Sequence, residues 1–236
     1  MPAPPTRFDL LDALRGFAVV LMMAFHFSFD LSMFGYVRID FYQDPFWLNA
    51  RIFIVTLFVG VAGASLSLAT RDGIHWQRFL RREAILLACA LLVSAGSYAM
   101  FPQSWIFFGI LHFMALAGLL AVPFLHFGIS NLVVGVLILL ASWLFTHPLF
   151  DAPALQWLGF MTHKPITEDY APLVPWFGVL LLGIFIGKQL PNSNLFQYPL
   201  HTQRWAKPLL WLGRHSLLVY MLHQPIFILL LVLLAL

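Results

Sequence analysis

Apolar residues gather in seven segments, and the loops between these segments carry most of the charged residues. Each segment approaches or exceeds the roughly 20 residues that a helix needs to cross the hydrocarbon of a bilayer. The segments cover residues 12–32, 50–69, 84–101, 105–124, 128–146, 172–188 and 208–235. In the last one, Gly213 to Ser216 interrupt the apolar run, which indicates a short interfacial turn. We therefore predict an all-α, polytopic membrane bundle of about seven transmembrane helices that forms one domain over residues 1–236.

The charges of the loops predict the orientation of the chain in the membrane. Residues 70–83 and 188–207 are rich in Arg and Lys, whereas residues 33–49 and 147–171 carry mostly Asp and Glu. Basic loops stay on the cytoplasmic side. We therefore expect a cytoplasmic N-terminus, an external C-terminus and an external loop at residues 147–171. A loop of that length is usually functional, and this one is a candidate cap over a substrate entrance.

The composition excludes an ordinary soluble domain. Hydrophobic residues make up 61% of the chain and charged residues only 10%, against about 25% in soluble proteins. The single Cys89 forms no disulfide framework, and the first apolar run lacks the features of a cleavable signal peptide. The net charge of +3 gives no indication of a nucleic-acid partner. We expect a multi-pass protein of the bacterial cytoplasmic (inner) membrane, with the lipid bilayer as its main partner; a homo-oligomer is compatible with the sequence.

The first segment carries polar residues that a membrane helix rarely holds without a reason. Asp12, Arg15, His26 and Asp30 fall within about 60° of one another on a helix, and we call these four residues the polar stripe. Each charge near the bilayer centre costs on the order of 3 kcal/mol, so the stripe predicts a polar cavity inside the protein. The alternative is that Asp12 and Arg15 form a local ion pair and that His26 is a packing residue.

Two further histidines lie inside predicted membrane segments. His223 shares a helix face with Ser216 and Tyr220, and Pro225 next to it removes a backbone hydrogen bond, which favours a hydrated cavity over a simple kink. His112 alone is more typical of a packing hydrogen bond, but it lies at a similar depth to His26. We expect no metal site, since the three histidines show no dense ligand spacing and no Cys partner.

The basic segment at residues 70–83 has two interpretations. It contains Arg71, Arg78, Arg81 and Arg82, together with Trp76. These residues are either the positive-inside signal alone or a binding surface for a phosphorylated cofactor, because Arg pairs with phosphate and Trp can stack on a base.

Together, the histidines and the Arg residues suit a group transfer between the two sides of a membrane. Imidazole changes its charge near neutral pH, so His26, oriented by Asp30, is a candidate base toward an attacking amine or hydroxyl. It is equally a candidate covalent acyl carrier. His112 and His223 are then candidate partners in the catalytic cavity.

Five motifs in order carry a resemblance to a known family. They are RFxxLDALRG followed by FHFxxD, RFLRRE, IFFGILHF, APLVPWFGVLLLGIFIG and LGRHSLLVYMLHQP. The chain resembles the heparan-α-glucosaminide N-acetyltransferase catalytic-domain-like proteins, within the transmembrane acyltransferases. The resemblance implies transfer of an acetyl or other acyl group from cytoplasmic acyl-CoA to a glycan-like acceptor on the far side, with His26 as the catalytic histidine. It also implies that Arg15 and the segment Arg71 to Arg82 contact the coenzyme. The chain is far shorter than the lysosomal enzyme of that family, so heparan sulfate is not carried over as the acceptor.

Two other classes of protein fit the same residues. A proton-coupled small-solute transporter would use the intramembrane histidines as a proton relay. A non-catalytic membrane subunit would need them only for packing.

Overall fold

The computed structural model describes residues 8–192 and 199–234, and within these residues it contains helices and no strand. The chain forms two compact units, one from residues 1–61 and 190–236 and the other from residues 62–189. Helix α2 contributes its first part to one unit and its last part to the other.

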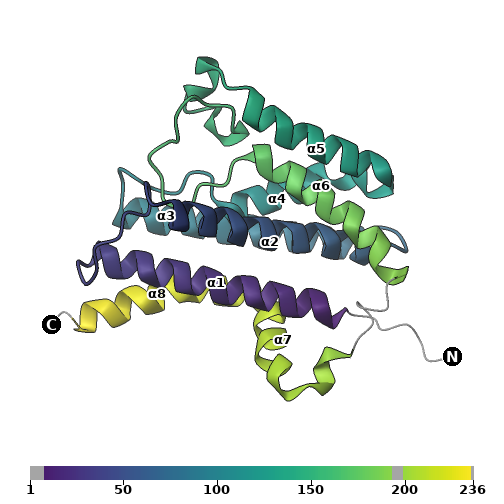
Figure 1. The fold of residues 1–236 in the computed structure, drawn as a ribbon, viewed down its shortest axis with the longest axis horizontal. Coiled ribbons are helices and arrows are strands. Elements are labelled where there is room, and N and C mark those ends of the chain that lie inside the picture. Colours follow the sequence, from purple (N-terminus) through teal and green to yellow (C-terminus); the bar gives the residue numbers. More distant parts are fainter. Residues whose placement is uncertain (1–7, 193–198, 235–236) are drawn as a thin grey trace. The chain divides into compact units, whose positions relative to one another are not determined.

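Each of the seven predicted segments contains a helix (Figure 1). The α-helices are α1 Asp9–Met33, α2 Pro45–Ala69, α3 Trp76–Met100, α4 Ile110–Leu120, α5 Ile129–Leu144, α6 Leu173–Gln189, α7 Lys207–Arg214 and α8 Ser216–Leu234. The predicted interruption of the last segment is confirmed, because the helix breaks at His215 between α7 and α8. Within the described residues, α1, α2, α3 and α8 are long and apolar enough to cross a membrane, while α4, α5 and α6 are shorter apolar helices. The all-helical class is therefore confirmed, with four candidate membrane spans in the part of the chain that the structure describes; the count of seven spans and the orientation stay predictions.

Some helices begin at other residues than hydropathy predicts. Helix α3 begins at Trp76 rather than at residue 84, so Arg78, Arg81 and Arg82 lie on its first turns and not in a loop. Arg, Gln and Glu are good helix formers, and a hydropathy pattern does not detect them. Helix α4 begins at Ile110 rather than at residue 105, because other elements of its unit bind the backbone ahead of it.

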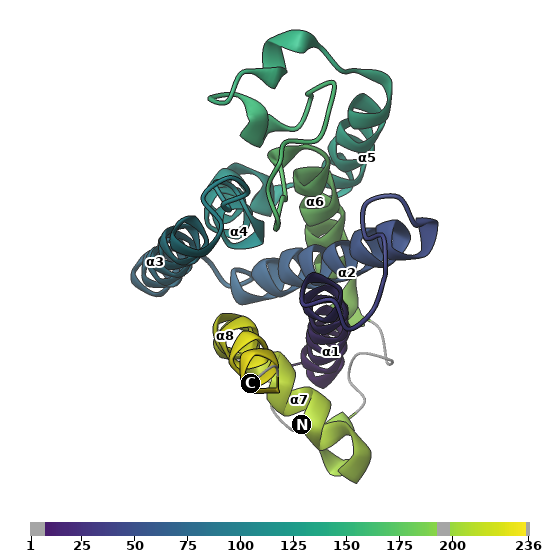
Figure 2. The same ribbon diagram turned by 90° about the vertical axis from the view of Figure 1, so that its left-hand side faces the viewer.

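In the first unit, α1 packs lengthwise against α8 and crosses α7 (Figures 1 and 2). Glycines make the α1–α7 crossing possible. A Cβ atom on Gly16 would overlap the carbonyl of Leu209, and a Cβ atom on Gly213 would overlap the carbonyl of Asp12. The two helix backbones therefore touch directly at this point.

The second unit also uses small residues where helices meet. A Cβ atom on Gly135 of α5 would lie 2.9 Å from the Gly178 carbonyl of α6. A Cβ atom on Gly187 would lie 2.6 Å from the Ala64 carbonyl of α2. Small residues at these positions let the helix backbones approach closely. Gly60 of α2, which belongs to the first unit, differs, because a Cβ atom added to it would meet no atom of the described residues within 4 Å.

Side chains, rather than helical turns, hold the backbone of residues 105–109 in the second unit. Ser94 Oγ donates to the Ile106 carbonyl at 2.6 Å, and the Ile106 N–H donates to Ser97 Oγ at 3.0 Å. Thr167 Oγ1 donates to the Trp105 carbonyl at 2.8 Å. Because these backbone groups already have partners, α4 has no need to begin before Ile110.

Candidate functional site

His26 of α1 and His223 of α8 lie beside one another in the first unit. Their ring centroids are 5.0 Å apart, with the ring planes at 66°. His223 is buried, with 6% of its surface exposed, and its Nδ1 lies 2.6 Å from the Tyr220 carbonyl oxygen. Since a carbonyl only accepts hydrogen bonds, Nδ1 must carry the proton in this contact. The basic nitrogen of the neutral His223 ring is then Nε2.

Aromatic rings surround this pair of histidines. Phe25 lies edge-on to His26 at a centroid distance of 5.9 Å. Phe227 lies edge-on to His223 at 5.8 Å, and Tyr220 lies 5.5 Å from the same ring. Apolar surroundings strengthen electrostatic interactions and hydrogen bonds, so a positive charge on either imidazole would be poorly screened by water.

Asp30 lies one helical turn beyond His26 and is completely buried. Its Oδ1 accepts a hydrogen bond of 2.6 Å from Nε2 of Gln224, the residue that follows His223. Within the described part of the chain, Asp30 Oδ2 and Gln224 Oε1 are buried without a hydrogen-bond partner. A buried carboxyl oxygen that accepts no hydrogen bond is costly, so Asp30 Oδ2 is a ready acceptor for a donor that reaches it. Sequence reasoning missed Gln224; its place between His223 and Pro225 was the available signal.

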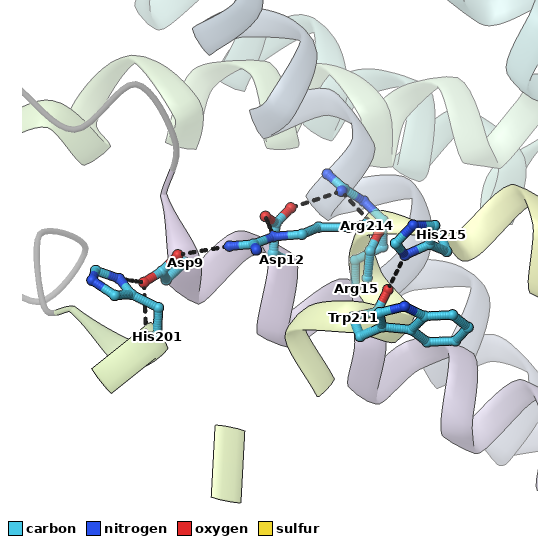
Figure 3. Close-up of polar contacts among 8 residues, drawn as sticks. Asp9, Asp12, Arg15, His201, Trp211, Arg214 and His215 are labelled. Atoms are coloured by element: carbon cyan, nitrogen blue, oxygen red, sulfur yellow. Dashed lines mark hydrogen bonds and ion pairs between the residues drawn. The ribbon is translucent and has the colours of Figure 1, made fainter. Parts of the chain in front are cut away.

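Arg15, the other basic residue of the polar stripe, lies at the opposite end of α1 from Asp30. Its Nη1 donates to Asp12 Oδ1 at 3.1 Å and to the Gly213 carbonyl at 3.3 Å (Figure 3). The local ion pair considered for Asp12 and Arg15 is therefore present. A contact of Arg15 with coenzyme stays a prediction.

This ion pair belongs to a larger group of charges where α1 crosses α7, which we call the α1–α7 ion cluster. Arg214 of α7 donates to Asp12 at 3.1 Å and to Asp9 at 3.2 Å, and the His201 backbone N–H donates to Asp9 at 2.9 Å (Figure 3). The cluster consists of Asp9, Asp12, Arg15, His201 and Arg214. Sequence reasoning did not assign Asp9, His201 or Arg214, because partners almost 200 residues apart leave no local pattern. The cluster joins the helix that carries His26 to the segment before the helix that carries His223.

His112 belongs to the second unit, and both of its ring nitrogens have partners there. The Gly109 N–H donates to His112 Nδ1 at 3.2 Å, so the neutral ring carries its proton on Nε2. That Nε2 lies 3.1 Å from Ser94 Oγ. His112 therefore caps the first turn of α4. Its predicted role as a cavity partner of His26 stays a prediction.

The Arg residues of the basic segment also belong to the second unit. Arg71, Arg78, Arg81 and Arg82 are all exposed. Arg82 Nη1 lies 2.7 Å from Oε1 of Glu83, whose side chain is 5% exposed. Glu83 lies against Gly118 of α4, where a Cβ atom would be 2.8 Å from the carboxyl group. Arg71, Arg78 and Arg81 thus present guanidinium groups at the surface, as a phosphate contact requires.

The structure brings together three of the nine predicted site residues: His26, Asp30 and His223. Arg15 lies in the same unit at the other end of α1, and His112 and the four Arg residues lie in the second unit. Within residues 8–192 and 199–234, no three His, Cys, Asp or Glu side chains are grouped so that they could hold a metal ion.

Comparison with known proteins identifies the family. Neither the curated proteins nor the solved structures gave a match. The family model described as heparan-alpha-glucosaminide N-acetyltransferase, catalytic, matches residues 7–225, which include every helix from α1 to α7 and the histidine of α8. The chain therefore belongs to the heparan-alpha-glucosaminide N-acetyltransferase catalytic family, as its motifs predicted.

Proposed function

We propose that this chain is a membrane-embedded acyltransferase that moves an acyl group, in the first instance acetyl, from cytoplasmic acyl-CoA to a glycan-like acceptor on the far side of the membrane. Membership of the family supports acyl transfer and gives no support to the proton-coupled transporter. The observation that carries the proposal is the contact between His26 and His223 next to the buried Asp30.

In one version of the reaction, His26 acts as a general base. Its imidazole takes the proton from the hydroxyl or amine of the acceptor while that oxygen or nitrogen attacks the thioester carbonyl. The C–S bond then breaks, and the coenzyme thiolate leaves with the proton from the imidazolium. His223 has its Nδ1–H fixed on the Tyr220 carbonyl, so its Nε2 is directed by a bond within α8 and serves as a partner in proton transfer.

In the other version, His26 carries the acyl group covalently. An imidazole nitrogen attacks the thioester, the C–S bond breaks, and the coenzyme leaves as the thiol. The acceptor then attacks the acyl-imidazole and releases the free histidine. Asp30 favours both versions, because a carboxyl group one turn away stabilises a positively charged intermediate on His26.

The experiment uses the whole chain in proteoliposomes with radiolabelled acetyl-CoA and an extract of cell-envelope glycans as the acceptor pool. We expect label to enter the glycans with the native chain and the His26→Ala chain to lose at least about 100-fold in rate, since general base catalysis contributes that much or more. His75→Ala, a change of an exposed histidine in the second unit, is the matched control. Full transfer by a folded His26→Ala chain would contradict the proposal. A covalent acyl-enzyme trapped by acid quench would favour the acyl-carrier version.

A further inference from the structure

The second unit contains a cavity of about 640 Å³ between the turn that joins α3 to α4 and the long loop before α6. The turn contributes Gln103, Trp105 and Phe107 to its lining, and the loop contributes Gln156, His163 and Pro165. Ligand pockets range over about 300–1,000 Å³, so the cavity has room for one or two sugar rings.

Hydrogen bonds within the unit hold both walls of the cavity in place. On the loop side, Tyr170 Oη donates to the Gln156 carbonyl at 2.5 Å, and Gln156 Nε2 donates to the Asp151 carbonyl at 3.0 Å. Asp151 accepts two bonds from Thr162, of 2.8 Å and 2.7 Å. The bond to Asp151 orients the Gln156 side-chain amide, and the other bonds hold the loop backbone, so a ligand need not order this wall of the cavity.

The chemistry of the lining fits a sugar. Trp105 is 38% exposed, and Tyr98 packs edge-on against it at a centroid distance of 5.8 Å, which holds the indole ring in place. An aromatic ring offers an apolar surface to the C–H groups of a pyranose. The amides of Gln103 and Gln156 and the imidazole of His163 each both donate and accept hydrogen bonds, as the hydroxyl groups of a sugar require. An acyl chain offers no hydrogen bond to any of these polar groups, whereas a sugar hydroxyl can bond to each of them.

We propose that this cavity binds a saccharide unit of the acceptor, with Trp105 as the stacking platform and Gln103 and Gln156 as the hydrogen-bonding groups. The inference rests on the proposed function in one respect, namely that the acceptor is a glycan. It adds the residues that hold the sugar and the kind of contact that recognises it.

Binding is measured by saturation-transfer NMR on the whole chain in nanodiscs, since sugar-based detergents would compete for the cavity. The probes are three neutral disaccharides: cellobiose, lactose and chitobiose. We expect at least one of them to bind, and Trp105→Ala to weaken its binding about tenfold or more, which corresponds to 1.4 kcal/mol. Trp105→Phe keeps an aromatic face and should retain most of the affinity. Trp143→Ala removes an indole that is 82% exposed on α5, outside the cavity, and should bind as the native chain does.

Two results would overturn the inference. One is the absence of binding of any disaccharide to the native chain. The other is native affinity in a folded chain that carries both Trp105→Ala and Gln103→Ala. Displacement of the bound disaccharide by a fatty acid would likewise count against it, because that result assigns the cavity to an acyl chain.

Separate measurements test the sugar site and the catalytic proposal, so one can fail while the other stands. His26→Ala should abolish acyl transfer and leave disaccharide binding unchanged. Trp105→Ala should raise the acceptor KM, and the control Trp143→Ala should leave it unchanged. If disaccharides bind at Trp105 but His26→Ala transfers acyl groups normally, the sugar site stands and the catalytic proposal falls.

Discussion

The rings of His26 and His223 lie 5.0 Å apart, although almost 200 residues separate them in the sequence. One histidine comes from α1 and the other from α8, and each helix brings a polar neighbour, Asp30 and Gln224, which bond to one another. Two residues from each helix thus form a compact polar group where α1 meets α8. Such a group is costly to bury, which is consistent with the catalytic role that we propose for the histidines.

Removal of the His223 imidazole should lower kcat strongly and change the Tm of the chain much less. We expect His223→Ala to reduce kcat by about 10²–10⁴-fold, the usual contribution of an acid–base group. His223→Asn keeps an N–H at the position of Nδ1 and can still donate to the Tyr220 carbonyl, so it should fold like the native chain while remaining equally inactive. Steady-state kinetics and the Tm of both variants check this. A fully active His223→Asn chain would reduce His223 to a structural residue.

Gln224→Leu should destabilise the first unit, because it leaves the buried Asp30 without its donor. We expect a loss of about 1–3 kcal/mol in the free energy of unfolding, the usual penalty for an unsatisfied buried group. In the double variant Asp30→Leu with Gln224→Leu, both polar groups are absent, so the loss should be smaller than the sum of the two single losses. Denaturant titration in detergent measures the coupling. Additive losses would show that the Asp30–Gln224 bond contributes nothing.

Gly213→Ala should disrupt the crossing of α1 and α7, because its Cβ would overlap the Asp12 carbonyl. Overpacking of this kind costs about 1–3 kcal/mol or more, and here the obstacle is backbone that has little freedom to move. Gly60→Ala is the matched control, since its added methyl meets no described atom within 4 Å and alanine favours a helix. A Tm several degrees lower for Gly213→Ala and an unchanged or higher Tm for Gly60→Ala are the expected results. Equal Tm values would mean that the helices separate easily.

Acid should loosen the loop before α6. The hydrogen bonds from Thr162 hold the pKa of Asp151 below its ordinary value, helped by the nearby His163 and His147. A carboxyl whose pKa is lower in the folded than in the unfolded state stabilises the folded loop. This stabilisation is complete at a pH above the unfolded pKa of about 4 and is lost as the pH falls through the pKa of the folded state. We expect cleavage of the loop by pepsin to increase as the pH falls below about 4. Thr162→Val should raise the pKa of Asp151 and shift this increase to higher pH, whereas Thr162→Ser should behave as the native chain. Identical profiles for all three would contradict the role of the hydroxyl.

Arg78 and Arg81 should contribute to acyl-CoA binding if the surface at the start of α3 holds the coenzyme phosphates. Replacing both with Gln removes two exposed guanidinium groups. We expect the KM for acyl-CoA to rise about tenfold while kcat changes little. Each charge-assisted hydrogen bond contributes about 1.5–3 kcal/mol, and solvent screening reduces this contribution at the surface. Arg38→Gln, a change of an exposed Arg in the first unit, is the control for loss of charge alone. An unchanged KM for acyl-CoA in the double variant would show that Arg78 and Arg81 do not bind the coenzyme, and their positive charge would then serve only to orient the chain in the membrane.

Hydropathy predicted the fold class because the energy of a membrane helix depends on its own residues. Every predicted segment contains a helix, and the break before Ser216 follows from Gly213 and the polar residues after it. The ends of helices are different, since the first turns of α3 are polar and the start of α4 depends on Ser94 and Thr167, which come from other elements. Local sequence contains no information on such partners.

The candidate site was predictable to the extent that its residues are unusual in a membrane. His26, Asp30 and His223 were found because charge and imidazole are rare in hydrocarbon, whereas Gln224 was missed because an uncharged amide is less conspicuous. The pairing of Arg214 with Asp9 and Asp12 depends on how α7 folds back on α1, which no periodicity encodes.

The glycine contacts between α1 and α7 have a consequence for anyone who recombines members of this family. Gly16 faces Leu209 and Gly213 faces Asp12 with no space for a side chain, so the shape of each helix is matched to the other. A chimera that takes its first forty residues from one homologue and its last forty from another combines an α1 and an α7 whose contact surfaces did not evolve together. The segments that contain α1 and α7 should therefore be exchanged as a pair, even though most of the described chain lies between them.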